Sequence, residues 1–233
     1  MISKGLQDKI ANATVKISKK EGRGVLVRNQ LILTAAHCIN FNCEGYMVLG
    51  DHFIEEIETI NGRLKVEVYA VEPVSDIAVL GQLDVQDFED ENDKFIDFCE
   101  KVKPVELFMD KVRAFQKFPV YIYTHQKTWI TGEAIKYDTK KNSPSIVIKT
   151  HDQIEGGMSG GPVVDKFGRL VAIISHASTK TNDLDLSSGM QPRPHLALPV
   201  WLLRGIQKDH DEEDKFTKKE WEKIKRDMIN KRI

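Results

Sequence analysis

The sequence has few cysteines, no long hydrophobic run and almost no net charge, and each absence excludes a class of protein. Its three cysteines, Cys38, Cys43 and Cys99, are too few for a disulfide framework, and none has a second Cys or His at a zinc-ligand spacing. The longest apolar run, 196–203, contains a proline and is too short to span a membrane. The formal net charge of −1 gives no electrostatic reason to expect nucleic acid or anionic lipid as a partner. We therefore expect a globular protein without a metal site.

The N-terminal segment does not look like a secretion signal. Its first eighteen residues alternate polar and apolar types and include Lys4, Asp8 and Lys9, so the continuous apolar core of a signal is missing. Together with the scarcity of cysteine, this pattern predicts a cytoplasmic protein. A mature form cut from a longer precursor is the alternative that the sequence leaves open.

Short runs rich in Val, Ile, Leu, Tyr and Phe recur between turn residues, which is the spacing of an all-β protein. They lie at 14–17, 24–27, 31–34, 46–49, 64–71 and 77–80 in the first half, and at 105–108, 120–123, 129–137, 145–150, 161–164 and 170–175 in the second. Twelve short strands predict two six-stranded antiparallel barrels. Because no sequence repeat relates the halves, we expect them to be alike in architecture only.

We expect residues 1–207 to form one domain. Its parts are barrel one at about 10–83, a connection at 84–103, barrel two at about 104–198 and a helix at 199–207 that a proline opens. The connection carries eight acidic residues against one lysine, with four large apolar residues interleaved, so we expect it to be partly helical. It is either a solvated surface with aromatic side chains beneath it or an acidic rim that favours basic partners.

Residues 208–233 form a charged tail. Thr217 and Glu220 have the spacing of a capping box, and Trp221, Ile224 and Met228 then share one face of a predicted helix. This apolar face packs on its own protein or on a protein partner, and a lone helix of this length is only marginally stable in water.

Three segments place a reactive side chain in a setting that suits chemistry. In Thr-Ala-Ala-His-Cys, the predicted strand ends in small residues, so that His37 leaves the strand where its ring can face a cleft. In Asp-Ile-Ala-Val-Leu, Asp76 directly precedes a buried strand and must be hydrogen-bonded, because an unpaired buried carboxylate costs several kcal/mol.

The third segment, Gly-Gly-Met-Ser-Gly-Gly-Pro, encloses Ser159 between glycines. Glycine permits positive φ and a close approach of the backbone to a ligand, so that successive N–H groups can converge on one anionic oxygen. A serine hydroxyl is a poor nucleophile unless a base takes its proton and a third group orients that base. His37 and Asp76 are the histidine and the acid in the right settings for these two tasks.

With these three segments in the order His, Asp, Ser, the sequence resembles the trypsin-like (chymotrypsin-fold) serine proteases from about residue 14 to residue 207. The resemblance implies that His37 is the general base and acid, that Asp76 orients it and that Ser159 attacks the scissile carbonyl. It also implies that the backbone N–H groups of Gly157 and Ser159 form the oxyanion hole. The substrate would be a polypeptide, with no metal or organic cofactor.

Within that family the sequence is closer to HtrA-like and other bacterial members than to digestive trypsins. Met158 stands where zymogen-activated members carry an Asp, and Cys38 lacks the upstream cysteine that pairs with it in the digestive enzymes. The Leu-Ala-Leu-Pro segment at 196–199 is similar to one that closes HtrA-like protease domains. The 26 residues after Gln207 are too few for the PDZ domain that usually follows there, because domains have at least about 50 residues.

The resemblance also places a substrate pocket. Gln153 would lie at its floor, where trypsins have an Asp, and a neutral amide offers no buried counter-charge, so a preference for Arg or Lys is not expected. Asp152 and Glu155 leave a register error of one or two residues open. The other walls would be formed by Ser175, His176, Ala177 and a position near His195. Ser175 is also a candidate hydrogen-bond partner of Asp76, and a histidine in the pocket would favour an acidic or amide side chain in the substrate.

The sequence therefore predicts a serine endopeptidase that acts through an acyl-enzyme intermediate. The alternative is a non-catalytic or partner-activated binding module, in which the same fold displays loops and the terminal helix to another protein.

Overall fold

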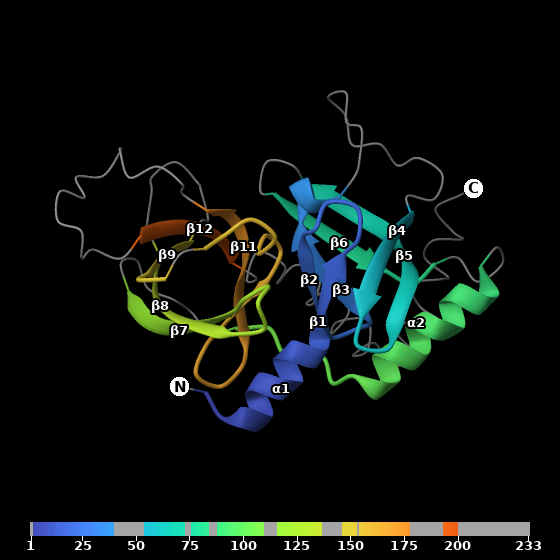
Figure 1. Cartoon of the computed structure of the whole chain (residues 1–233), viewed down its shortest axis with the longest axis horizontal. Coiled ribbons are helices and arrows are strands. Elements are labelled where there is room, and N and C mark those ends of the chain that lie inside the picture. The colour runs from blue at the N-terminus through green and yellow to red at the C-terminus, as the bar shows by residue number, and fades with distance from the viewer. Residues whose placement is uncertain are drawn as a thin grey trace, which may run out of the picture. The chain divides into compact units, whose positions relative to one another are not determined.

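The computed structural model describes residues 2–39, 54–72, 76–83, 88–109, 116–136, 146–152, 154–177 and 193–199. These ranges belong to one compact unit, Met1–Val200, and they contain twelve strands and two α-helices (Figure 1). The remaining unit, Trp201–Ile233, lies outside the described residues, and so do the predicted tail helix and residues 200–207 of the predicted terminal helix.

The first six strands form a closed barrel in the order β1-β2-β3-β6-β5-β4. They are β1 (Thr14–Ile17), β2 (Arg23–Val27), β3 (Leu31–Ala35), β4 (Ile54–Thr59), β5 (Gly62–Glu72) and β6 (Ile77–Gly81). All neighbouring strands are antiparallel, and β1 closes the barrel against β4. β6 is buried along its whole length, which matches its continuous apolar sequence.

The second six strands form another closed barrel, in the order β10-β11-β12-β9-β8-β7. They are β7 (Lys117–Tyr123), β8 (Trp129–Lys136), β9 (Ile146–Thr150), β10 (Pro162–Val164), β11 (Leu170–Ala177) and β12 (Arg193–Pro199). The order of strands around this barrel is the same as in the first, counted from its own first strand. The prediction of two six-stranded antiparallel barrels without a sequence repeat is confirmed.

The structure corrects several predicted strands. The run at 105–108 forms no strand; it is a connection that makes single bridges, Val27 with Val105 in barrel one and Leu107 with Leu170 in barrel two. The strands β4 and β12 were not predicted, and Pro199 ends β12 where a helix was expected to begin. The run at 46–49 lies outside the described residues.

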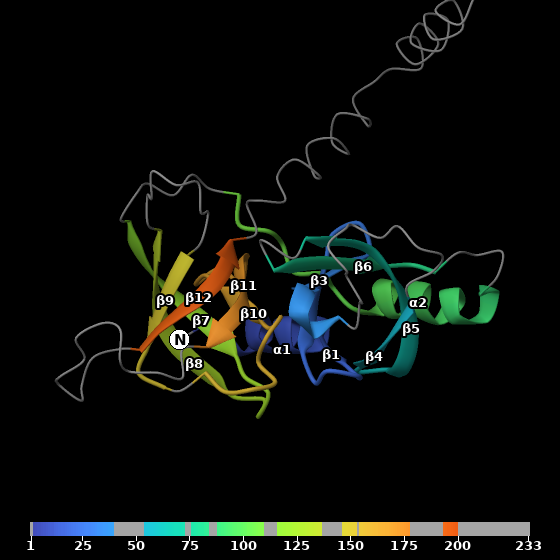
Figure 2. The same ribbon diagram turned by 90° about the horizontal axis from the view of Figure 1, so that it is seen from above.

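The helix α1 (Lys4–Ala13) was also not predicted, and it contacts both barrels. It runs directly into β1, and its Ile10 is fully buried. A Cβ on Gly168, in the turn between β10 and β11, would lie 3.0 Å from Leu6 Cδ2 and 3.6 Å from Ile10 Cδ1. Figures 1 and 2 show α1 between the base of barrel one and the strands of barrel two. Its apolar side therefore helps to hold the barrels together.

The acidic connection contains the helix α2 (Glu89–Lys101), as the sequence predicted. Phe95 and Phe98 are fully buried, and α2 packs on β5 of barrel one (Figure 1), while most of its charged residues are exposed. Among the described helices, neither is long and apolar enough to cross a membrane.

The register between β3 and β6 places the first two predicted catalytic residues. Ala35, the last residue of β3, pairs with Ile77, the first residue of β6. His37 follows β3 and Asp76 precedes β6, so antiparallel pairing brings the two residues together at one end of barrel one, although 39 positions separate them in the sequence. The small residues at the end of β3 continue into a short 3-10 helix, Ala36–Cys38, that carries the histidine.

Replacement of Ile10 by alanine should test the role of α1 in joining the barrels. We expect Ile10→Ala to lower the free energy of unfolding by about 2–5 kcal/mol, because it removes a fully buried side chain and leaves a cavity. Asp8→Ala is the matched control on the exposed side of the helix, where loss of an exposed ion pair should cost less than about 1 kcal/mol. Urea unfolding of both variants measures the difference; equal effects would show that α1 contributes no core packing.

Candidate active site

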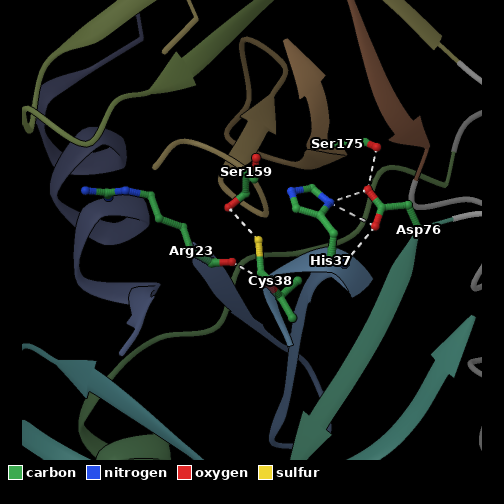
Figure 3. Close-up of polar contacts among 7 residues, drawn as sticks. Arg23, His37, Cys38, Asp76, Ser159 and Ser175 are labelled. Carbon is green, nitrogen blue, oxygen red and sulfur yellow. Dashed lines mark hydrogen bonds and ion pairs between the residues drawn. The ribbon is translucent and has the colours of Figure 1, made fainter. Parts of the chain in front are cut away.

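His37 and Asp76 make a close, two-point contact (Figure 3). The ring Nδ1 of His37 lies 2.8 Å from Asp76 Oδ2 and 3.0 Å from Oδ1, and the backbone N–H of His37 donates to Oδ1 at 2.9 Å. The carbonyl of Asp76 in turn accepts the N–H of Ala36 at 3.0 Å. Backbone and side chain of Asp76 therefore both hold the segment that carries His37.

Barrel two supplies a third partner for the Asp76 carboxylate. The hydroxyl of Ser175, on β11, donates to Asp76 Oδ2 at 2.6 Å, as expected (Figure 3). Burial alone would raise the pKa of Asp76, but the hydrogen bonds from His37 and Ser175 together outweigh it, so that the pKa lies below its ordinary value. Asp76 is therefore an anion at neutral pH. Its φ of 53° is in the left-handed region, a conformation that this network stabilises.

The same contact acts on the imidazole. The hydrogen bond to Asp76 raises the pKa of His37 above its ordinary value of 6.5; a contact with Cys38 raises it further, and partial burial opposes both. Because Nδ1 faces the carboxylate, it carries the proton of the neutral ring, which leaves Nε2 as an acceptor. In the view of Figure 3, the edge of the ring that carries Nε2 faces Ser159.

Ser159 lies in a tight turn just before β10. Gly157 and Gly160 have φ values of +82° and +77°, which glycine adopts without strain. The N–H groups of Met158, Gly160 and Gly161 donate to backbone carbonyls at 3.3, 2.6 and 2.9 Å. Those of Gly157 and Ser159 donate to no protein atom within the described ranges. The turn itself thus uses neither of the two N–H groups predicted for the oxyanion hole.

The turn is bound to barrel one through the carbonyl of Ser159. This oxygen accepts the N–H of Arg23 at 2.7 Å and lies 3.6 Å from the thiol sulfur of Cys38. No hydrogen bond joins the Ser159 hydroxyl to His37 in the described part of the chain. The sequence predicted no role for Arg23 and indicated only that Cys38 lacks an upstream cysteine, because nothing in a single strand or motif shows that these residues meet Ser159.

The predicted substrate pocket is described only in part. Ala177 and His195 are register partners on β11 and β12, and His176 pairs with Leu196 beside them, so these predicted wall positions are neighbours in the sheet. The hydroxyl of Ser175 donates its hydrogen bond to Asp76. Gln153, the predicted floor, lies outside the described residues. The assignment of this pocket therefore stays a prediction.

No group of three His, Cys, Asp or Glu side chains able to hold a metal ion occurs in the described ranges. The sequence predicted no role for His125. Its Nε2 lies 3.6 Å from Oε2 of Glu155, and Glu155 stands at the start of the turn that carries Ser159.

Solved structures with a similar fold include bacterial proteases. A serine endoprotease from Yersinia pestis is 18% identical over 90% of this chain and 66% of its own, with a TM-score of 0.53. The Rv3671c protease from M. tuberculosis, in the inactive form of a serine-to-alanine mutant, is 13% identical over 88% of this chain and 89% of its own, also with a TM-score of 0.53. Its active form gives a TM-score of 0.51 at 13% identity, over 86% of this chain and 81% of its own. At these identities the likeness shows the fold.

A comparison of the sequence with curated proteins gives no match. The family model of the trypsin-like peptidase domain, in contrast, matches residues 22–173, which include His37, Asp76 and Ser159. This match covers well over half of the chain, and the two barrels have the fold that the solved proteases share. The chain belongs to the family of trypsin-like peptidase domains.

Proposed function

We propose that this peptidase is a serine endopeptidase in which His37, Asp76 and Ser159 act as a catalytic triad. The observation that carries the proposal is the pairing of His37 Nδ1 with both oxygens of Asp76 at 2.8 and 3.0 Å. This pairing selects the tautomer whose Nε2 accepts a proton, on the ring edge that faces Ser159 (Figure 3).

The proposed reaction has two halves. Ser159 Oγ forms a bond to the carbonyl carbon of the scissile peptide while His37 Nε2 takes its proton, and the imidazolium returns that proton to the amine as the C–N bond breaks. Water then attacks the acyl-enzyme ester with His37 again as base, which releases the new carboxylate and restores Ser159. Catalytic contacts such as that between Oγ and Nε2 often tighten only when substrate binds.

The oxyanion that forms in each half would be held by the N–H groups of Gly157 and Ser159. Each such donor stabilises a tetrahedral transition state by about 3 kcal/mol, since it is already aimed where charge develops. That these two N–H groups have no other acceptor in the described part of the chain supports this role.

Substitution of the nucleophile and of the base tests the triad. Ser159→Ala and His37→Ala should each lower kcat for a fluorogenic peptide by about a millionfold, and the double variant should lose little more, because the two residues act as one unit. Ser3→Ala, at an exposed serine before α1, is the matched control and should keep full activity. Near-additive losses in the double variant would contradict a cooperating triad.

A fluorophosphonate probe separates the proposed enzyme from the binding-module alternative. The folded protein should become labelled at Ser159, as identified by peptide mass spectrometry, and Ser159→Ala should not. If the folded protein is not labelled at all, a non-catalytic module is favoured. Labelling that occurs only after a partner protein is added would indicate partner activation.

The Asp76–His37 contact predicts a pH dependence. His37 acts as a base only when it is neutral, and its pKa is raised above 6.5. On the acid side of the pH profile, kcat/KM should therefore rise with pH, and the midpoint of this acid limb should lie above pH 6.5. Asp76→Asn should move this limb to lower pH, because the carboxylate that favours the imidazolium is gone, and should lower kcat about ten-thousandfold through the wrong tautomer. A limb that stays in place in Asp76→Asn would show that Asp76 does not act on His37.

The substrate preference expected from the sequence can be measured with a peptide library. A neutral Gln153 at the pocket floor should give no dominance of Arg or Lys before the cleaved bond, and a histidine at position 176 or 195 should favour an acidic or amide residue there. Dominance of Arg or Lys would place one of the nearby acidic residues, Asp152 or Glu155, in the pocket instead.

A further inference from the structure

The carbonyl oxygen of Ser159 is bound by barrel one at two points. It accepts the N–H of Arg23, the first residue of β2, at 2.7 Å, and the Cys38 thiol donates to it at 3.6 Å (Figure 3). The peptide that carries Ser159 belongs to barrel two, so these two bonds fix the residue proposed as nucleophile relative to the barrel that supplies His37.

A buried hydroxyl binds the carbonyl oxygen of Arg23. Thr34, on β3, is fully buried, and its Oγ1 donates to the Arg23 carbonyl at 2.5 Å. Gly160 lies directly on the same carbonyl: a Cβ at this position would overlap the Arg23 oxygen and would lie 2.5 Å from Thr34 Oγ1. The turn of Ser159 therefore rests on the backbone of Arg23 at two points, its N–H and its carbonyl, and Thr34 binds the carbonyl.

The Cys38 thiol fills the space between this contact and the histidine. Its side chain is buried, with the residue 2% exposed, and a Cβ on Gly22 would overlap its sulfur. The thiol also contacts His37 and contributes to the raised pKa of that residue. Cys38 thus touches the residue proposed as base and the backbone of the residue proposed as nucleophile, and its sulfur packs closely against Gly22.

We propose that Thr34 and Cys38 are positioning residues for Ser159: Thr34 holds the Arg23 backbone through its carbonyl, so that the Arg23 N–H meets the Ser159 carbonyl, and Cys38 donates to that Ser159 carbonyl directly. The inference rests on the proposed role of Ser159 as nucleophile. It matters for the rate because an error of about 1 Å in the position of a reacting group can cost about a hundredfold. The substrate does not contact either side chain in this scheme, so its binding should be little affected.

The experiment compares isosteric and conservative variants on a fluorogenic peptide. Thr34→Val removes the hydroxyl at nearly constant volume, and Cys38→Ala removes the thiol; each should lower kcat about tenfold, which corresponds to about 1.4 kcal/mol, with KM within about twofold of wild type. Thr34→Ser and Cys38→Ser keep a donor and should restore kcat to within about threefold of wild type.

Two matched controls lie away from the site. Thr59→Val removes a hydroxyl that donates to the Gly62 carbonyl at 2.9 Å in a turn of the same barrel, and Cys99→Ser changes the cysteine of α2. Both should keep the wild-type kcat. Thermal unfolding of every variant ensures that rates are compared on folded protein.

For Cys38, the pH profile distinguishes the loss of its contact with His37 from a loss of stability. Cys38→Ala should move the acid limb of kcat/KM to lower pH, because a contact that raises the pKa of His37 is lost, whereas Thr34→Val should leave the limb in place. A variant that is merely less stable would change the melting temperature and not this limb.

The outcomes separate this inference from the proposed function. If the wild-type protein is labelled by fluorophosphonate at Ser159 while folded Thr34→Val and Cys38→Ala keep the wild-type kcat and pH limb, the positioning inference is wrong and the triad stands. If the wild-type protein is not labelled by the probe, both the proposed triad and the positioning inference are wrong. If Thr34→Val does not fold, the inference is tested on Cys38 alone. A lower kcat and a shifted acid limb in Cys38→Ala, with kcat restored in Cys38→Ser, would support it, and wild-type values in Cys38→Ala would contradict it.

Discussion

The carboxylate of Asp76 is largely removed from water, with its side chain 22% exposed, and an anion in such a place must be compensated by hydrogen bonds. Its donors are the ring and backbone N–H of His37 from barrel one and the hydroxyl of Ser175 from barrel two. Satisfying this one charge therefore fixes the tautomer of the histidine and brings β11 to the end of β3. The geometry of the candidate site depends on this compensation.

A second set of contacts between the barrels completes the site. The carbonyl of Ser159 accepts the N–H of Arg23, the first residue of β2; a side chain at Gly160 would collide with the Arg23 carbonyl, which accepts the Thr34 hydroxyl. Helix α1 packs on the turn at Gly168 and holds the barrels from another point. Residues far apart in the sequence thus converge because two closed barrels with the same strand order dock against each other.

Where the sequence failed to predict an element, a specific residue pattern explains the failure. β4 reads Ile-Glu-Glu-Ile-Glu-Thr, and its buried Glu55 interrupts the alternation that signals a half-buried strand. β12 contains prolines at 194 and 199, which argue against a strand because proline cannot donate to the ladder. The run at 105–108 has the apolar composition of a strand, but it passes from one barrel to the other and makes only single bridges with each.

The sequence by itself determined what local chemistry can specify: ten of the twelve described strands, the acid ahead of β6, the histidine after β3 and the glycine-flanked serine, since each depends on the residue types of one short segment. The family resemblance suggested the contact of Ser175 with Asp76, which the structure contains, but only the tertiary structure decided that Arg23 and Cys38 bind the Ser159 carbonyl. These contacts join segments from different barrels, and their existence depends on how the two barrels pack. No local pattern in the chain encodes that packing, because it results from the sum of many contacts between distant residues.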